Sequence, residues 1–384
     1  MQMIAVAGLS ARMLAESGRS AGIPVLALDL FGDRDTRRAA RRWQGIGDAA
    51  SLRISADALV AALREGRRDG RLTGWVPGGG FEMEPALVER GAAAAVLLGN
   101  PHWVWRRVKT PSIFFVRLTA LGIPHPETRA DPPAEPEGWL RKCATGTGGW
   151  HVRPLDAALG DDGGCCFYQR AVPGQPMSAL FLANGSELRI LGFNRQLVGI
   201  DAARPFVYRG VIGPVALPAR LAERIGDALR ALVAEFGLVG LNSLDFMVDG
   251  DDFSVLEINP RPSASMALHE DAVPGGLLQA HVEACRARRL PPPNAAPRQR
   301  TVIRGCETVF ADRALTLEES AIGWLERRGW CHDIPAGAAT VLPGQPVCTV
   351  SVDAADADAV AGLLAIRRDA VLKTLNNFSE QAHV

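Results

Sequence analysis

The sequence lacks long apolar runs, an excess of charge of either sign, and clustered cysteines. No run of 18 apolar residues occurs among the 384, so we expect no transmembrane helix and no membrane partner. Basic and acidic residues number 42 each, which argues against a nucleic-acid partner bound through a broad positive field. The seven cysteines include no C-x-x-C pair, so we expect reduced thiols and no zinc site. Residues 1–8 carry no basic segment, which favours a buried strand over a signal peptide and indicates a cytoplasmic protein.

Lysine is also scarce in this chain. Only Lys109, Lys142 and Lys373 occur among the 42 basic residues, and every other one is arginine. The planar fork of arginine and the compact ammonium of lysine are not interchangeable in a binding site. A chain that otherwise uses arginine is expected to keep lysine where a site needs an ammonium.

The order of elements predicts an α/β fold. Strand-like and helix-like segments alternate over the first hundred residues, which is typical of a doubly wound, mainly parallel sheet. We expect an N-terminal domain at 1–100, a central domain at 101–290 with a lid at about 110–167, and a small β-rich C-terminal domain at 291–384 that ends in a helix. The expected strands are 3–8, 24–30, 71–77, 92–98, 139–143 and 167–172, and the expected helices are 10–21, 57–67, 218–236 and about 354–375, with a proline-rich linker at 290–297.

Residues 244–261 predict a β-hairpin that carries two acids. Two apolar runs flank the turn sequence Asp249-Gly250-Asp251-Asp252. A hairpin centred on residue 251 places Asp245 opposite Glu257, with Asn259 on the same side of the sheet.

Two carboxylates that face each other among apolar neighbours repel, so a cation must lie between them or one must be protonated. Oxygen ligands from aspartate, glutamate and asparagine suit Mg²⁺ that is shared with nucleotide phosphates. An exposed hairpin with a hydrated polar face remains the alternative.

The motif formed by Asp245 and Glu257-Ile258-Asn259-Pro260-Arg261 resembles the metal-binding signature of the ATP-grasp superfamily. The whole chain is similar to the ATP-dependent carboligase group related to biotin carboxylase. This resemblance implies a pre-ATP-grasp N-terminal domain, a two-part ATP-grasp unit with a mobile lid, and ATP and Mg²⁺ as cofactors, with Mn²⁺ able to replace Mg²⁺.

The resemblance also implies roles for individual residues. Asp245, Glu257 and Asn259 would hold the metal ions, and Arg261 and Lys142 would act on the transferring phosphoryl group. The expected ATP contacts are Lys109, Lys142, the lid glycines Gly146, Gly148 and Gly149, and the hinge residues Gln169, Arg170 and Val172. The expected substrate contacts are Ser10, Arg12, Gly80, Glu82 and Ser263. Outside these sets, Asp29 is interpreted as a capping or surface acid, and His269 as a helix-capping or surface histidine.

The function implied by the resemblance is an ADP-forming carboxylate–amine ligase that works through an acyl phosphate. Its partners would be a small carboxylate and an amine, with glutamate and a tyramine-type amine of methanofuran-like cofactors as the first pair, and a homodimer as the default assembly. At two positions the sequence departs from the pattern of the family. Ser265 stands where biotin carboxylase has a glutamate base, and Arg170 stands where many members have an acid. A bicarbonate-activating carboxylase, a non-catalytic ATP sensor and a nicotinamide-dependent enzyme remain alternatives.

Overall fold

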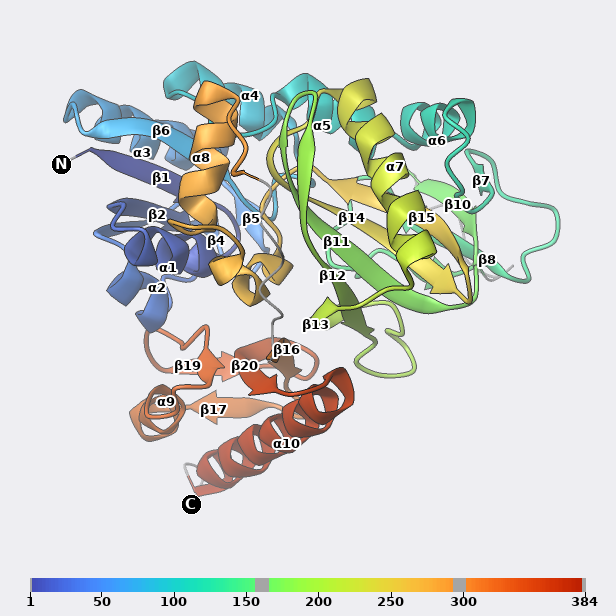
Figure 1. The fold of residues 1–384 in the computed structure, drawn as a ribbon. Helices are drawn as coiled ribbons and strands as arrows, with labels where there is room; N and C mark the ends of the chain where they lie inside the picture. Colours follow the sequence, from blue (N-terminus) through green and yellow to red (C-terminus); the bar gives the residue numbers. More distant parts are fainter. Residues whose placement is uncertain (1, 156–165, 293–301, 382–384) are drawn as a thin grey trace.

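The computed structural model describes residues 2–155, 166–292 and 302–381. Figure 1 shows an N-terminal α/β region in blue, a central region in green and yellow, and a C-terminal region in red that lies beneath both. Most of the predicted linker at 290–297 and part of the predicted lid lie outside the described residues. In the described part of the chain, no helix combines the length and the apolar character that crossing a membrane requires.

The N-terminal region is built on a parallel sheet with the strand order β3-β2-β1-β6. Its elements confirm the predicted alternation: β1 (Met3–Ala7), α1 (Arg12–Ser20), β2 (Val25–Asp29), α2 (Arg34–Ala39), β3 (Arg42–Gly45), α3 (Ala56–Arg68) and β6 (Leu72–Pro77). A short hairpin of β4 (Gly47–Asp48) and β5 (Arg53–Ile54) precedes α3.

The strand predicted at 92–98 is wrong. Residues Ala86–Ala94 form helix α4, and only Leu97 makes an isolated parallel bridge to Trp75. Alanine is the best helix former, and a short apolar run does not distinguish a buried helix segment from a buried strand. Gly91 allows α4 to pack closely against Trp75, because a Cβ at this position would lie 2.3 Å from Cζ2 of Trp75.

The central region begins with two helices and a small antiparallel sheet. Helices α5 (His102–Lys109) and α6 (Pro111–Ala120) lead into a sheet with the order β7-β10-β8-β9. Its strands are β7 (Thr128–Arg129), β8 (Trp139–Cys143), β9 (Arg153–Pro154) and β10 (Cys166–Arg170). The strands predicted at 139–143 and 167–172 correspond to β8 and β10.

An eight-stranded sheet joins the central and C-terminal regions. Its order is β15-β14-β11-β12-β13-β16-β20-β18. The central strands are β11 (Gln175–Asn184), β12 (Leu188–Val198), β13 (Tyr208–Val215), β14 (Val239–Asp249) and β15 (Asp252–Asn259), and the C-terminal strands are β16 (Ile303–Phe310), β18 (Cys331–His332) and β20 (Pro346–Ala354). Because β16 pairs with β13, the C-terminal region extends the central sheet.

Helices cover these strands. Helix α7 (Ala219–Phe236) buries its apolar face and ends at Gly237 in the left-handed conformation, with φ of 66°, as the sequence predicts. After β15 come the 3₁₀ turns η1 (Ala264–Leu268) and η2 (Glu270–Ala272) and helix α8 (Leu277–Ala287). The C-terminal region adds α9 (Glu319–Glu326), the pair β17 (Leu315–Leu317) and β19 (Ala339–Val341), and the long helix α10 (Ala357–Gln381).

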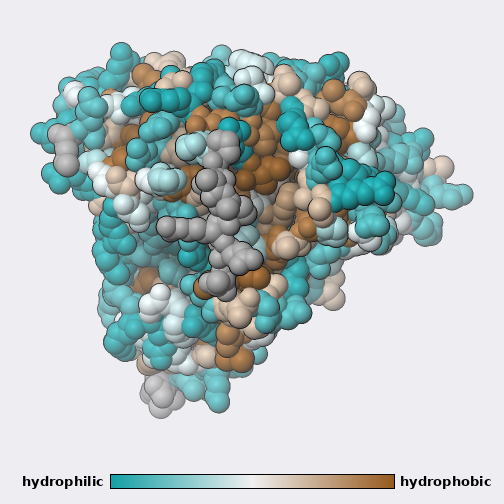
Figure 2. Space-filling model, in the orientation of Figure 1, coloured by the Kyte–Doolittle hydropathy of each residue, from teal (hydrophilic) through white to brown (hydrophobic). Residues whose placement is uncertain are grey.

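The N-terminal and central regions share a hydrophobic core. Leu180 of β11 packs in one buried cluster with Val6 of β1 and with Leu277 and Leu278 of α8. Figure 2 shows hydrophobic residues gathered between α8 and the strands β11 and β12, with hydrophilic residues over most of the outer rim. This shared core fixes the loops that follow β1 and β6 relative to the hairpin β14–β15.

Candidate functional site

The hairpin β14–β15 brings the two predicted acids together. Asp245 is the paired partner of Glu257, as the sequence predicts. The turn consists of Gly250 and Asp251, and the register shifts between Asp245 and Phe246 because the β15 strand carries one extra residue, Leu256. The bulge therefore sits directly beside the acid pair and sets which residues face each other.

Lys109 supplies a cation to one of the two acids, Glu257. Its Nζ donates to Oε2 of Glu257 at 2.8 Å and to Oδ1 of Asn259 at 3.1 Å. The amide of Asn259 in turn donates through Nδ2 to Oδ2 of Asp245 at 3.1 Å. Lys109 is the last residue of α5, so this helix presents its ammonium to two side chains of the hairpin, Glu257 and Asn259.

The charges of the pair are unequal. Burial and the neighbouring charge of Glu257 raise the pKa of Asp245, against the opposing effects of Lys109, Arg261 and a hydrogen bond from Gln196. Burial also disfavours the charge of Glu257, but the ammonium of Lys109 outweighs it and lowers the pKa of Glu257. A divalent ion beside Asp245 would supply the positive charge that this carboxylate lacks.

Lys142 of β8 is held by a hydrogen-bonded chain. Its Nζ donates to Oε1 of Gln169 at 2.6 Å, and Nε2 of Gln169 donates to Oγ1 of Thr128 at 3.1 Å. Burial lowers the pKa of Lys142 to about 8, and Glu257 partly opposes this shift. The charge of Lys142 therefore depends on pH close to neutrality.

The glycine loop docks on the start of β13. The carbonyl of Gly148 accepts from the backbone N–H of Tyr208 at 2.9 Å. A Cβ on Gly149 would lie 2.0 Å from the carbonyl oxygen of Phe206, and one on Gly146 would lie 1.9 Å from the ring of His151. Glycine is therefore required at both positions for this close approach.

Other predicted hinge residues lie at the edge of the small sheet. Arg170, at the end of β10, is exposed, donates to the carbonyl of Glu137 at 3.0 Å and lies over the ring of Trp139. Val172 follows β10 and is half-buried. The role of these two residues beside an adenosine stays a prediction.

Arg261 is anchored to the loop that follows β6. Its guanidinium pairs with Oε1 of Glu82, and Oε2 of Glu82 accepts from the N–H of Gly80 at 2.7 Å. Glu82 is 2% exposed and its two oxygens are both engaged. Ser263 lies two residues beyond Arg261, with its Oγ 2.9 Å from Oγ of Ser265. The loop after β6 therefore contacts the segment that follows the metal-binding motif, as the prediction of a shared site requires. In this contact the carboxylate of Glu82 holds the guanidinium of Arg261.

Arg12 faces the C-terminal region. Its guanidinium donates to both carboxylate oxygens of Asp333, at 2.7 and 3.1 Å, and to Glu16 at 3.0 Å. Ser10 accepts from the N–H of Arg12 at 3.4 Å through Oγ. A substrate that binds Arg12 would have to compete with Asp333.

For two residues the structure excludes the surface alternative. Asp29 is fully buried and accepts from the N–H groups of Ala11 and Gly32 and from Nε1 of Trp43, so it caps these turns and is not a surface acid. His269 is also fully buried, with Nε2 2.7 Å from Oδ1 of Asn194, so the surface interpretation is wrong.

Three site residues escaped the sequence analysis. Gln196 of β12 hydrogen-bonds to Asp245, and the buried Tyr208 of β13 lies within the electrostatic range of Asp245 and Arg261. His151 lies among the charges of Glu257, Lys142 and Lys109. Gln196 and Tyr208 come from strands that reach the site only through sheet pairing, and His151 had one local signal, its position two residues after the glycine loop.

These residues fit a divalent ion and a nucleotide. Two carboxylates and an amide oxygen form a hard-oxygen donor set of the kind that Mg²⁺ and Mn²⁺ prefer. Lys109 and Lys142 would face phosphate oxygens, and glycine-loop N–H groups can approach such oxygens where side chains would block them. A nucleotide there would supply a phosphoryl group for transfer.

Comparisons with known proteins address the family. Residues 113–265 match the family model described as an ATP-grasp domain. An uncharacterized protein of Methanocaldococcus jannaschii is 25% identical over 183 residues, which cover 47% of this chain and 41% of that protein. The match therefore spans about two fifths of the length of that curated relative.

Two solved structures share the fold over nearly the whole chain. Biotin carboxylase from Campylobacter jejuni, solved with an ATP analogue, has a TM-score of 0.70 at 14% identity and covers 98% of this chain and 95% of its own. An L-amino acid ligase from Bacillus licheniformis has a TM-score of 0.70 at 13% identity and covers 96% and 97%. Residues 113–265 therefore match an ATP-grasp domain, and this domain lies in a chain whose fold is shared with both solved structures.

Proposed function

We propose that this protein is an ATP-dependent, ADP-forming ligase that joins a carboxylate to an amine. The observation that carries the proposal is the set of Asp245, Glu257 and Asn259 on one hairpin face, with the Lys109 ammonium on Glu257 and Asn259. Oxygen ligands and two lysines at one place suit a metal–triphosphate better than a metal alone.

The reaction balances in two steps. A carboxylate oxygen of the substrate attacks the γ-phosphorus, a new O–P bond forms, and the bond to the bridging oxygen breaks to release ADP. The amine nitrogen then attacks the acyl carbon, phosphate leaves, and the nitrogen loses a proton. The protein contributes mainly position and charge to both steps.

Each side chain then has a role. Asp245, Glu257 and Asn259 would hold the divalent ions, which would stabilise the charge of the phosphates, and Lys109 would bind phosphate oxygens. Lys142 binds the phosphates beside Gln169, and Arg261, held by Glu82, neutralises charge on the moving phosphoryl group. The glycine loop at 146–149 excludes water from the acyl phosphate.

The carboxylate is proposed to be an amino acid. The fold shared with an L-amino acid ligase supports this choice. Glutamate with tyramine is the first pair to test. Ser265 leaves no carboxylate where a bicarbonate-activating site would need a base, so a carboxylase is the weaker candidate.

A phosphate-release screen tests the proposal. Purified protein with Mg-ATP is assayed against amino acids combined with amines, and bicarbonate is included as a separate arm. ADP release that requires both an acid and an amine supports a ligase, and release that requires bicarbonate supports a carboxylase. Binding of Mg-ATP with no release in any arm would indicate a sensor instead.

The matched variants are Glu257→Gln and Asp252→Asn. Glu257→Gln should reduce ADP release at least a hundredfold, because it removes a metal ligand. Asp252→Asn changes an exposed acid at the other end of the same strand and should leave the rate unchanged. Full activity in Glu257→Gln would refute the metal assignment.

A further inference from the structure

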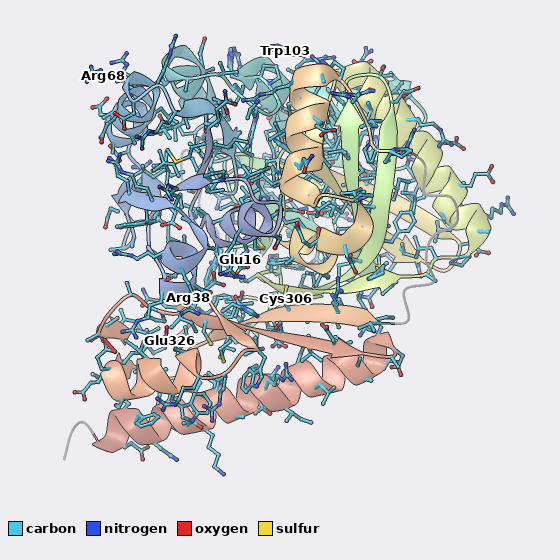
Figure 3. The ribbon with its side chains drawn as sticks, turned by 60° about the vertical axis from the view of Figure 1, so that its left-hand side comes forward. Glu16, Arg38, Arg68, Trp103, Cys306 and Glu326 are labelled. Atoms are coloured by element: carbon cyan, nitrogen blue, oxygen red, sulfur yellow. The ribbon has the colours of Figure 1, made fainter. Side chains whose placement is uncertain are left out.

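A second group of acidic side chains lies where the N-terminal and C-terminal regions meet. Glu16 comes from α1, Asp35 from α2, and His332 and Asp333 from β18 and the residue after it. Figure 3 shows Glu16 at the lower edge of the N-terminal region, above the strands of the C-terminal region, with Arg38 and Glu326 on the same boundary. The roles proposed above use none of Glu16, Asp35 and His332.

The geometry of three of these residues suits a metal ion. One ligand atom each from Glu16, Asp35 and His332 can be chosen so that all lie within 4.8 Å of one another. Atoms bound to one ion at about 2.0–2.2 Å are separated by about 3 to 4.4 Å. Small rotations of half-buried side chains therefore suffice to complete such a site.

The histidine is prepared to act as a ligand. Nε2 of His332 lies 2.8 Å from Oγ of Ser351. When the hydroxyl of Ser351 accepts from Nε2–H, the lone pair of the His332 ring is on Nδ1 and is free to bind a metal. Hydrogen-bond partners orient metal-bound histidines in the same way. Burial and the positive charge of Arg12 lower the pKa of His332 to about 4, so the ring is neutral at pH 7.

The junction carries more negative than positive charge. Arg12 donates to Asp333 and Glu16 and lies 3.6 Å from Asp35, so one guanidinium faces three carboxylates. The backbone N–H groups of Asp333 and Ile334 donate to Asp35.

A fourth carboxylate, Asp33, has no partner. It is 7% exposed, and among the described residues no hydrogen bond or ion pair reaches its side chain. Burial and the charges of Asp333, Asp35 and Asp29 raise its pKa to about 8, with Arg12 opposing. At this pKa the carboxyl is mostly protonated at pH 7, and a nearby bound cation would favour its ionised form.

We propose that Glu16, Asp35 and His332 bind one divalent transition-metal ion at the junction of the N-terminal and C-terminal regions. Two carboxylates with an imidazole favour ions such as Zn²⁺ over Mg²⁺, which prefers oxygen ligands alone. The ion would join α1 and α2 to β18, next to the ion pairs of Arg34 with Glu319 and Glu326 and of Arg38 with Glu326.

Calorimetric titration of the full-length protein with Zn²⁺, without nucleotide, tests this site. The parent is the variant Asp245→Asn/Glu257→Gln, so that the hairpin acids do not add a second site. We expect one ion per chain, and at least tenfold weaker binding in His332→Gln and in Glu16→Gln. His102→Gln is the matched control, because His102 lies on α5 beside an exposed acid, Glu89, away from the junction.

A thermal readout keeps the test independent of folding losses. Zn²⁺ should raise the unfolding temperature of the parent and of His102→Gln, because an ion that binds only the folded state stabilises it. It should not raise that of His332→Gln, whatever the starting temperature of that variant. Absence of stoichiometric binding by the parent, or equal binding by His332→Gln, would overturn the site. Neither outcome bears on the ligase proposal, since ATP is absent.

Discussion

At the scale of residues, the site depends on how the lysine ammonium groups neutralise the charges of the carboxylates. The sequence predicts either a cation between Asp245 and Glu257 or one protonated acid. The structure places Lys109 on Glu257 and Asn259, and burial raises the pKa of Asp245. The scarcity of lysine pointed to Lys109 and Lys142, while Gln196 and Tyr208 gave no signal. Gln196 and Tyr208 lie far from the hairpin in sequence, so spacing did not point to them.

Removal of the Lys109 ammonium should cost stability as well as activity. In Lys109→Met, Glu257 loses its partner, and the free energy of unfolding should fall by about 1–2 kcal/mol, a modest value because Glu257 is half-exposed. Urea unfolding without nucleotide measures this. The double variant Lys109→Met/Glu257→Gln should recover most of the loss, and an additive double variant would contradict the coupling.

Lys142 should set the upper limit of the pH range for nucleotide binding. Its pKa is lowered to about 8 by burial, so the ammonium is present below that pH and is lost above it. The affinity for ATP should therefore weaken as pH rises from 7 to 9, in titrations at constant ionic strength. Lys142→Arg, which stays charged, should bind with little pH dependence over this range. A wild-type affinity that is constant up to pH 9.5 would contradict the assignment.

At the scale of elements, register and close packing decide the site. The hairpin prediction placed the turn half a residue too far along the chain, and the bulge at Leu256 restored the pairing of Asp245 with Glu257. A bulge has no local sequence signal here, so the correct pairing was only partly predictable. For residues 92–98 the sequence predicts a strand, but residues 92–94 belong to helix α4.

The glycine loop offers a test at this scale. Gly149→Ala would bring a Cβ to 2.0 Å from the carbonyl oxygen of Phe206 and should prevent docking of the loop on β13. We expect kcat/KM to fall at least tenfold, about 1.4 kcal/mol in the barrier, with the fold intact by circular dichroism. Gly148→Ala is the control, because φ is also positive there but its Cβ would meet only the Trp150 side chain, at 3.4 Å. Equal losses of kcat/KM in both variants would indicate that backbone strain at positive φ, and not the contact with Phe206, causes the loss.

At the scale of the whole molecule, one sheet runs from the hairpin into the C-terminal region (Figure 1). The division of the chain near residues 100 and 290 stays a prediction. The pairing of β13 with β16 was not predictable, because it joins residues about a hundred positions apart. The contact of Arg12 with Asp333 joins residues 321 positions apart. Both contacts arise from assembly of the domains, which local patterns do not encode.

The central claim is that the face of β14–β15 with Asp245, Glu257 and Asn259 holds divalent ions together with a triphosphate. The most direct measurement is a crystal structure with Mn²⁺ and a non-hydrolysable ATP analogue, with anomalous scattering to locate the metal. The account predicts a Mn²⁺ peak within about 2.3 Å of oxygens of Glu257 and Asn259, with the Lys109 ammonium moved onto the phosphates. A bound analogue whose Mn²⁺ lies away from both side chains would contradict it.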